Sequence, residues 1–318
     1  MSKAETILSS IVSTVGAIAI TILALKLVGF LRKFFVRESY DHGLRYGQHT
    51  WALITAPTST TGSGFALQLA KRGFHIVLVG RDIEKMHRLR DLIVLKHMVK
   101  VRTIVADFRK AFSLPFYNDI LRQVEDLDVS IVVNAVGCAG LSEKFHQMSA
   151  EKIRECLVVN TFGCVLLCQQ FLPRLVQRFH RSAIINISSE IAHQAIPGMA
   201  VSSGSKAFIT QFTMAAAYEY RDKIDIMATQ PLAVKKKRTD GEEGRNLIII
   251  DSEAFASACL RQLGHTSTTS GHWIHALQSG FFWIWPNEWK LAVWEKFIMP
   301  KHFEMIKEPR LVSASTLQ

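Results

Sequence analysis

The sequence predicts a doubly wound α/β fold, in which helices cover both faces of a parallel β-sheet. Short, uniformly apolar segments recur along the chain, as expected of strands that are buried on both faces. Stretches long enough for a helix separate them. With 318 residues, 48% apolar and 20% charged, the chain can build one large domain of this kind. Its ligand should lie beyond the carboxyl ends of the strands.

A long apolar run comes first in the chain. Residues 11–25 carry no charge, and the apolar character extends over residues 7–31 with Lys26 as its only interruption. This length suffices to span a bilayer. Lys26, Arg32, Lys33 and Arg37 follow the uncharged run, whereas only Lys3 precedes it, which places the following domain in the cytosol. A cleaved signal peptide is the alternative, but its apolar region is usually shorter, and no clear cleavage site precedes Arg32.

Strand and helix signals alternate from residue 51 onward. The first strand is expected at residues 51–55. A helical face follows, formed by Phe65, Ala66, Leu69 and Ala70, and Gly73 can end that helix. Further apolar strands are expected at residues 76–79, 101–105, 131–133, 183–187 and 224–228. Each connecting segment is long enough for a crossover helix, so the strands are predicted to run parallel.

Composition narrows the class of function. The five cysteines show no C-x-x-C spacing and the twelve histidines form no H-E-x-x-H pattern, so we expect no metal site and reduced, mostly buried thiols. The formal charge of +11 is compatible with nucleic-acid binding. A membrane-anchored domain beside anionic lipid explains the charge more simply, and we predict no nucleic-acid partner.

The turn after the first strand reads Thr55-Ala56-Pro57-Thr58-Ser59-Thr60-Thr61-Gly62. It resembles the cofactor turn of the short-chain dehydrogenase/reductase family, T-G-x-x-x-G-x-G. Ala56 and Thr60 replace two glycines, and Gly62 is retained. Such glycines allow positive φ and let the backbone approach a pyrophosphate at a helix N-terminus. An ordinary Ser/Thr-rich turn that caps a helix is the alternative interpretation.

Further residues match the family pattern in order. Arg81 matches the basic residue that NADP(H)-preferring relatives place against the 2′-phosphate. The neighbouring Asp82 weakens the predicted preference for NADP(H) over NAD(H). Asp107 matches a residue beside the adenine. Residues 133–137, Val-Asn-Ala-Val-Gly, resemble the family's N-N-A-G segment. The resemblance thereby implies a cofactor set of Thr55, Thr60, Gly62, Arg81, Asp107, Asn134, Lys206 and Pro231, for NADP(H).

The catalytic pattern has one substitution. Asn160 matches the family's catalytic asparagine, and Ser189 its substrate-orienting serine. Thirteen residues after Ser189 the family has a tyrosine, but this chain has Ser202, followed by Lys206 where Y-x-x-x-K needs its lysine. None of the five tyrosines has a lysine four positions later, so no other register restores the motif. The implied catalytic set is Asn160, Ser189, Ser202 and Lys206.

Similarity to one branch of the family extends over nearly the whole chain. The anchor, the strand at Trp51, the helix ending at residues 218–221 and the segment 271–277 resemble very-long-chain 3-oxoacyl-CoA reductases and 17-beta-hydroxysteroid dehydrogenases. That resemblance implies an endoplasmic-reticulum membrane enzyme, facing the cytosol, that reduces a lipid or acyl-CoA-type ketone with NADPH; a homodimer is compatible with it. We expect an anchor at residues 1–38, a Rossmann-type domain at 39–275 and an aromatic amphipathic segment at 276–318.

Serine is a poor substitute for tyrosine as a proton donor. Tyrosine has a pKa near 10 that an adjacent ammonium lowers, whereas serine is far less acidic and reaches less far. Loss of a positioned acid costs about 10²- to 10⁴-fold in rate. The sequence therefore leaves open a slow ketoreductase, which would use a water held by Ser202, Lys206 and Ser189, and a non-catalytic homologue that binds cofactor or lipid and acts through a partner. A retuned enzyme of specialised metabolism is a third, weaker hypothesis.

Two later segments bear on partners. Residues 235–238, Lys-Lys-Lys-Arg, fit CoA phosphates or lipid headgroups, or simply a solvated loop. Residues 281–297 concentrate Phe and Trp between lysines, which indicates an interfacial segment or, equally, a cover over the substrate pocket.

Overall fold

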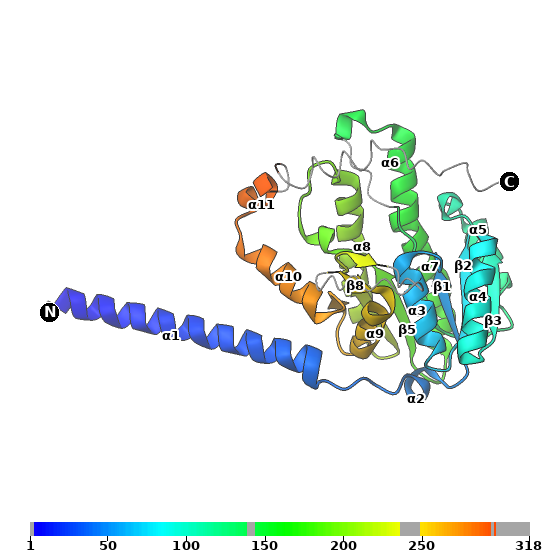
Figure 1. The fold of residues 1–318 in the computed structure, drawn as a ribbon, viewed down its shortest axis with the longest axis horizontal. Helices are drawn as coiled ribbons and strands as arrows, with labels where there is room; N and C mark the ends of the chain where they lie inside the picture. Colours follow the sequence, from blue (N-terminus) through cyan, green and yellow to red (C-terminus); the bar gives the residue numbers. More distant parts are fainter. Residues whose placement is uncertain (1–2, 139–143, 236–248, 294–295, 297–318) are drawn as a thin grey trace, which may run out of the picture. The chain divides into compact units, whose positions relative to one another are not determined.

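The computed structural model describes residues 3–138, 144–235, 249–293 and 296, without the side chains of residues 281–284 and 287. The chain divides into two compact units, Met1–Ser39 and Tyr40–Gln318 (Figure 1). The basic residues 236–238 and much of the C-terminal aromatic segment lie outside the described residues.

The first unit is one long helix. α1 (Lys3–Leu31) continues into a π-helical turn, η1 (Arg32–Val36). Together they form a span of 34 residues, in which the most apolar 18-residue stretch has a mean hydropathy of 2.3 and is not buried in the protein. At about 1.5 Å per residue the helix is long enough to cross a bilayer. It is thus a candidate membrane span, as the apolar run predicts.

The second unit is built around a seven-stranded parallel sheet with the order β3-β2-β1-β4-β5-β6-β9. Its strands are β1 (Trp51–Thr55), β2 (His75–Gly80), β3 (Val101–Val105), β4 (Val129–Asn134), β5 (Ser182–Ile187), β6 (Ile224–Thr229) and β9 (Thr268–Thr269). The first six confirm the strands predicted from the apolar segments. The sequence-based prediction missed β9, because its two threonines give no apolar pattern.

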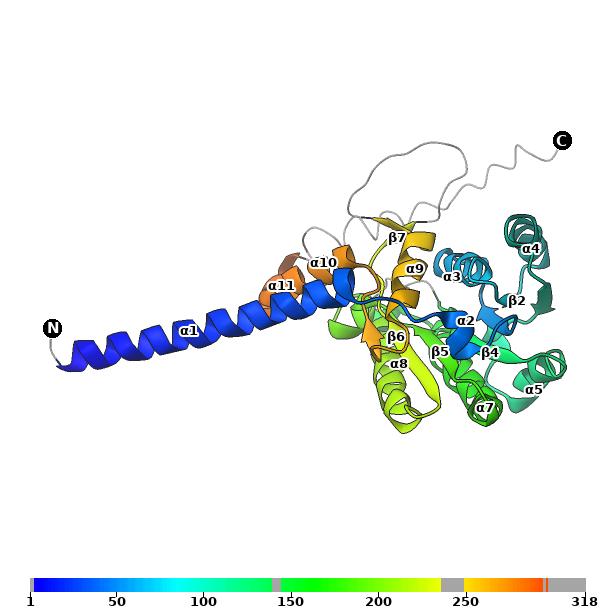
Figure 2. The same ribbon diagram turned by 90° about the horizontal axis from the view of Figure 1, so that it is seen from below.

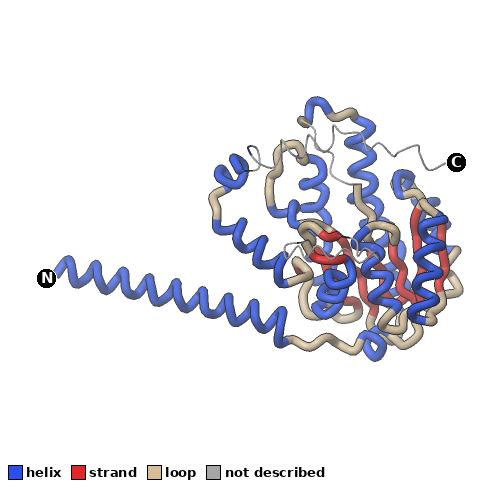
Figure 3. Tube along the Cα trace, viewed as in Figure 1, coloured by secondary structure: helices blue, strands red, loops and turns tan. Residues whose placement is uncertain are grey.

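Helices cover both faces of the sheet (Figures 2 and 3). One layer holds α3 (Thr60–Ala70), α4 (Ile83–His97) and α9 (Ser252–Gln262), and the other α5 (Leu114–Arg122), α7 (Gly163–Gln177) and α8 (Ala200–Glu219). Strand side chains alternate between two buried cores: Ala52 and Ile54 belong to the first, Leu53 to the second. This is the predicted doubly wound fold.

The remaining described elements precede the first strand, connect the strands or follow the last strand. They are α2 (His42–Tyr46), η2 (Phe108–Lys110), η3 (Phe145–Gln147), α6 (Ala150–Leu157), η4 (Val158–Phe162), η5 (Glu190–His193), β7 (Val234–Lys235), β8 (Ile250–Asp251), α10 (Trp273–Ile284) and α11 (Asn287–Val293). The boundary expected between residues 275 and 276 falls inside α10.

Strand order reverses between β1 and β4. From β1 the chain runs through β2 to β3 on one side, and from β4 through β5 to β6 on the other. Parallel sheets of this kind bind ligands outside the carboxyl ends of the strands at such a reversal. The strand ends that matter are therefore Thr55 and Asn134.

Candidate active site

The turn from β1 to α3 is closed tightly around Gly62. A Cβ atom on Gly62 would lie 2.3 Å from the carbonyl oxygen of Ala56 and 2.9 Å from Ser59 Oγ. Ala56 has a φ of 45°, the left-handed conformation that glycine favours. Ser59 Oγ accepts a hydrogen bond from Gly62 N at 3.1 Å and caps α3. The backbone thus keeps a glycine-type turn although Ala56 and Thr60 replace glycines, and the capping role expected of a Ser/Thr-rich turn is also present.

Thr55 and Asn134 join the ends of the central strands in different ways. Thr55 Oγ1 accepts hydrogen bonds from Ala135 N at 3.0 Å and Val136 N at 3.3 Å, so it holds the turn after β4 against β1. Asn134 directs its side chain into the protein, where Nδ2 donates to Asn186 Oδ1 at 2.8 Å. Asn134 can therefore face a ligand with its backbone, while its amide ties β4 to β5.

Arg81 and Asp107 follow β2 and β3, at the outer end of the same edge. Arg81 is exposed. Asp107 caps η2 and forms an ion pair with Arg109 at 2.5 Å, and this hydrogen-bonded guanidinium lowers the pKa of Asp107 below its usual range. Asp82, which could repel a phosphate from Arg81, instead caps α4 and pairs with Lys85 at 2.7 Å. The carboxylate of Asp82 is thus engaged by the first turn of α4 rather than by Arg81.

Asn160 lies in η4, a π-helical turn inserted between α6 and α7. Such turns are frequent at functional sites because they redirect side chains. Asn160 Oδ1 accepts a hydrogen bond from Cys138 N at 2.8 Å, and Nδ2 donates to Ser205 Oγ at 2.8 Å and Cys156 Sγ at 3.4 Å. The amide therefore fastens the loop after β4 to α6 and α8.

Ser202 and Lys206 lie one turn apart on the same face of α8. Ser202 is 4% exposed, and its Oγ lies 3.8 Å from Cys156 Sγ. Lys206 Nζ donates to the carbonyl oxygen of Ile187 at 2.9 Å. Burial lowers the pKa of Lys206, and the neighbouring thiols partly oppose this shift. The ammonium group of Lys206 and the hydroxyl group of Ser202 thus project from the same face of α8.

Gly137, which follows β4, lies close to two of the predicted catalytic residues. A Cβ on Gly137 would lie 3.4 Å from Lys206 Nζ and 3.7 Å from Asn160 Oδ1. Cys156 contacts both Asn160 and Ser202. Asn160, Ser202 and Lys206 therefore surround one site at the end of β4.

Ser189 and Pro231 form the neighbouring wall. Ser189 Oγ donates to the carbonyl oxygen of Pro231 at 3.4 Å, and Glu190 N donates to the same oxygen at 3.1 Å. Ser188 Oγ donates to the backbone oxygen of Lys206 at 2.8 Å. The segment after β5 is thereby held against both the segment after β6 and α8.

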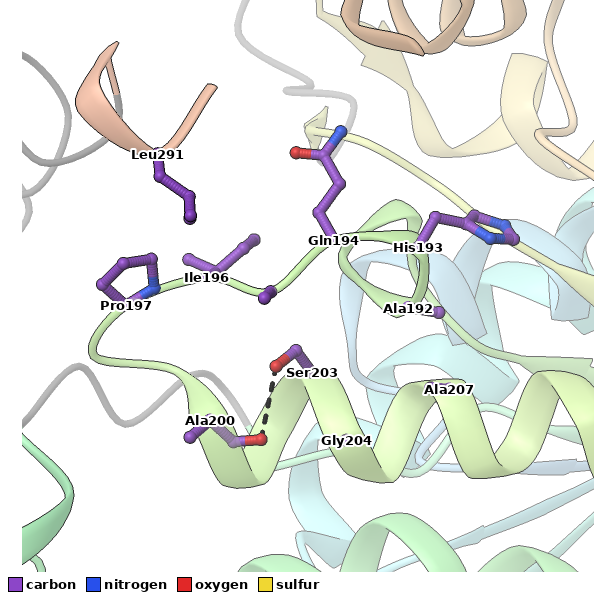
Figure 4. Close-up of a pocket in the computed structure, with 11 residues that line it drawn as sticks. Ala192, His193, Gln194, Ile196, Pro197, Ala200, Ser203, Gly204, Ala207 and Leu291 are labelled. Atoms are coloured by element: carbon purple, nitrogen blue, oxygen red, sulfur yellow. Dashed lines mark hydrogen bonds between the residues drawn. The ribbon is translucent and has the colours of Figure 1, made fainter. Parts of the chain in front are cut away.

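An apolar cavity of about 620 Å³ lies against α8 (Figure 4), and none of Asn160, Ser189, Ser202 and Lys206 is among the residues that line it. Residues 192–197 form one wall, and Ala200, Ser203, Gly204 and Ala207 of α8 form another. Leu291 of α11 also lines it. Trp285 and Trp289 of the same C-terminal region are 39% and 61% exposed. The described C-terminal region thus contributes to the cavity and also leaves large aromatic rings at the surface.

Sequence profiles identify the family. The profile described as short chain dehydrogenase matches residues 50–246, which hold the turn, the strand ends and the site around Lys206. The chain belongs to the short-chain dehydrogenase family.

Relatives within this family carry different names. The human "Inactive hydroxysteroid dehydrogenase-like protein 1" is 31% identical over 79% of this chain and 75% of its own. The mouse "Very-long-chain 3-oxoacyl-CoA reductase" is 29% identical over 86% of this chain and 88% of its own. A 7beta-hydroxysteroid dehydrogenase structure superposes with a TM-score of 0.64 at 20% identity over 83% of this chain and 98% of its own, which supports the fold.

Sequence reasoning missed several residues that contact the candidate site. Ser59, Cys138, Cys156 and Ser205 all contact predicted site residues. Cys156 precedes Asn160 by four residues, a helical spacing that signals a shared face. Cys138 gives no such signal, because it follows a strand and reaches the site only through the fold.

Proposed function

We propose that this chain is a membrane-anchored short-chain dehydrogenase homologue that binds NADP(H) and slowly reduces a keto group on a lipid or acyl-CoA-type substrate. The observation that carries the proposal is the convergence of Asn160 and Lys206 on one space, in which Ser202 takes the place expected of a tyrosine. Partial burial of the Lys206 ammonium group is unfavourable by itself, and a ligand bound at this site would offset that cost.

The cofactor site fits a dinucleotide. The turn packs tightly on Gly62, where a Cβ would collide with Ala56 O, and the backbone N–H groups at the N-terminus of α3 favour a pyrophosphate. Thr55, Thr60, Asn134 and Pro231 border the same strand ends. Arg81 supplies an exposed guanidinium for a 2′-phosphate, with Asp107 nearby for the adenine end.

When bound, the cofactor would supply a hydride to the carbonyl carbon. The protein must then hold the carbonyl oxygen and deliver a proton to it. Ser189 and Ser202 offer hydroxyl groups, and Lys206 offers a positive charge that stabilises an alkoxide. Ser202 is too weak an acid to donate directly at neutral pH, so a water molecule held by these three side chains is the proposed donor.

The apolar cavity supports a hydrophobic substrate. Ala192, Ile196 and Leu291 are among the side chains that line it, and Ser203 and Gly204 of α8 line it on the side of the helix that does not carry Ser202 and Lys206. The proposed substrate would place an aliphatic chain in this cavity and extend its keto group around α8 to Lys206. The reductase relative named for very-long-chain 3-oxoacyl-CoA supports this choice of substrate class. The candidate span α1 supports a membrane location, which we propose is the endoplasmic reticulum, and the positive charges after the apolar run favour a cytosolic domain.

A non-catalytic role is the second candidate. Ser202 Oγ contacts Cys156 Sγ, so the only hydroxyl at the tyrosine position already faces a thiol. Homologues from several vertebrates carry the word "Inactive" in their names. In this case the chain would bind the cofactor or a lipid and act through a partner, without turnover.

Cofactor titration tests the proposal. NADPH added to the purified full chain in detergent should change its fluorescence at sub-millimolar concentration. Arg81→Ala should weaken NADPH binding about tenfold, equivalent to about 1.4 kcal/mol, and leave NADH binding unchanged. Arg122→Ala, an exposed arginine near the end of α5, is the matched control. Absence of NADPH binding would rule out the reductase role.

A further inference from the structure

Two helices, α10 and α11, follow the last strand of the sheet, and α10 is fixed to the segment that forms one wall of the cavity. His275 and Ser279 lie four residues apart on α10, and both are buried. His275 Nε2 donates to the carbonyl oxygen of Ala233 at 3.3 Å, and Ser279 Oγ donates to the carboxylate of Glu190. Glu190 begins η5, which leads into the wall of residues 192–197. The buried face of α10 therefore holds this helix beside the cavity.

The shorter helix, α11, carries apolar side chains on two opposite faces. Leu291 lines the cavity near Ile196 and Pro197 (Figure 4). Trp289 and Val293 lie two residues before and after Leu291, which places them about 200° away from it around a helix of 3.6 residues per turn. Trp289 is 61% exposed and Val293 is 37% exposed. One face of α11 thus lines the cavity, and the opposite face is accessible from outside.

Trp285 extends this accessible face. Its ring contacts that of Trp289, with centroids 5.9 Å apart, and Trp285 is itself 39% exposed. We call Trp285, Trp289 and Val293 the outer apolar face. Exposed groups of large apolar side chains mark interaction surfaces. Tryptophan in particular is enriched at membrane–water interfaces, because its ring is apolar and its N–H group is polar.

The chain keeps the domain within reach of a bilayer. The candidate membrane span ends with η1 at Val36, and α2 begins at His42. The connecting residues 37–41 extend over at most about 18 Å. A domain on so short a tether meets the bilayer surface at a high effective concentration, so weak apolar contacts are enough to hold one of its faces there. A lipid surface is therefore the partner that best fits the outer apolar face.

We propose that the outer apolar face rests on the bilayer that holds α1, and that a lipid substrate passes from this bilayer along α11 into the cavity. The inference rests on the proposed membrane anchor and the proposed lipid substrate, and it adds the route between them. An acyl chain that follows this route enters the cavity without crossing water, in which its exposure is unfavourable.

Photolabelling of the full chain in a bilayer tests the inference. The chain is reconstituted in phosphatidylcholine vesicles that contain a phosphatidylcholine with a diazirine on one acyl chain. The vesicles are irradiated without any nucleotide, and mass spectrometry of the digested protein locates the attached lipid. Label should appear on α1, on residues 285–293 and on the cavity residues Ile196 and Ala200.

Two double variants make the comparison specific. Trp285→Ser with Trp289→Ser should lower the labelling of residues 285–293 and of the cavity at least about fivefold, because serine does not favour the interface. Leu95→Ser with Met98→Ser is the matched control. Leu95 and Met98, at the end of α4, are 81% and 91% exposed, more than either tryptophan. They should carry no label in the wild type, and their variant should be labelled like the wild type.

The outcomes separate this inference from the proposed function. Label on α1 alone would overturn the inference and leave the reductase role standing, as would cross-linking of Lys290 to a second copy of the chain by a lysine-reactive reagent. Label on residues 285–293 without label at Ile196 or Ala200 would overturn the entry route. Absence of label on α1 would contradict the membrane anchor itself, and with it both the proposed function and this inference.

Discussion

Ala56 and Gly62 show how a single residue can decide whether the cofactor turn survives. Ala56 accepts a left-handed φ of 45°, which costs a side-chain-bearing residue roughly 1–2 kcal/mol. Gly62 has no comparable freedom, because a Cβ atom would meet a backbone oxygen at 2.3 Å. The chain has therefore kept a glycine at the position of this turn where a side chain would collide with the backbone.

Gly62→Ala should destabilise the domain by about 1–3 kcal/mol and weaken NADPH binding at least about tenfold, since the turn must open to admit the methyl group. Gly204→Ala is the control, because nothing lies within 4 Å of the added atom on α8. That variant should be neutral or up to about 1 kcal/mol more stable. Urea unfolding and NADPH titration measure both effects. Equal stability of Gly62→Ala and wild type would contradict the tight turn.

At the scale of elements, α2 is attached to the domain through buried polar contacts. His42 is 5% exposed, and its Nε2 donates to the carbonyl oxygen of Leu260 at 3.0 Å. Burial, reinforced by the charge of Arg72, lowers the pKa of His42 to about 4. The folded protein therefore holds the imidazole of His42 in its neutral form at neutral pH.

His42 should make stability depend on pH in a defined window. The unfolded chain binds a proton to this histidine below about pH 6.5, whereas the folded chain resists it until about pH 4. Stability should therefore fall by about 3 kcal/mol as the pH drops through this window. His42→Gln should reduce that slope in urea unfolding, whereas the exposed His180→Gln should not. An unchanged slope in His42→Gln would exclude a buried neutral histidine.

The sequence predicted the central elements because their signals are local. Six strands are apolar runs bounded by turn residues. Thr55 and Asn134 end two of these strands, and Ser189 follows the end of a third by two residues. Contacts between distant segments left no such signal. The inward direction of Asn134 depends on Asn186, and Cys138 N contacts Asn160 only because the fold brings the end of β4 beside η4.

At the scale of the whole molecule, the chain combines a long apolar helix with a separate enzyme-type domain. The positive charges that follow the apolar run predict a cytosolic domain. In sealed microsomes, protease added outside should therefore digest the domain, and alkaline carbonate should not release the intact chain. Removal of residues 1–38 should transfer the domain to the soluble fraction. Protection of the domain from external protease would contradict the predicted orientation.

We propose that the site of the whole protein retains its binding and orienting groups but lacks a strong proton donor at Ser202. The most direct measurement compares NADPH consumption with a long-chain 3-oxoacyl-CoA by wild type, Ser202→Tyr and Ser202→Phe, each shown by circular dichroism to be folded. Ser202→Tyr should be at least about tenfold faster than wild type, and Ser202→Phe, which has the ring without the hydroxyl, should show no gain. A wild-type chain as fast as its Ser202→Tyr variant would contradict the account.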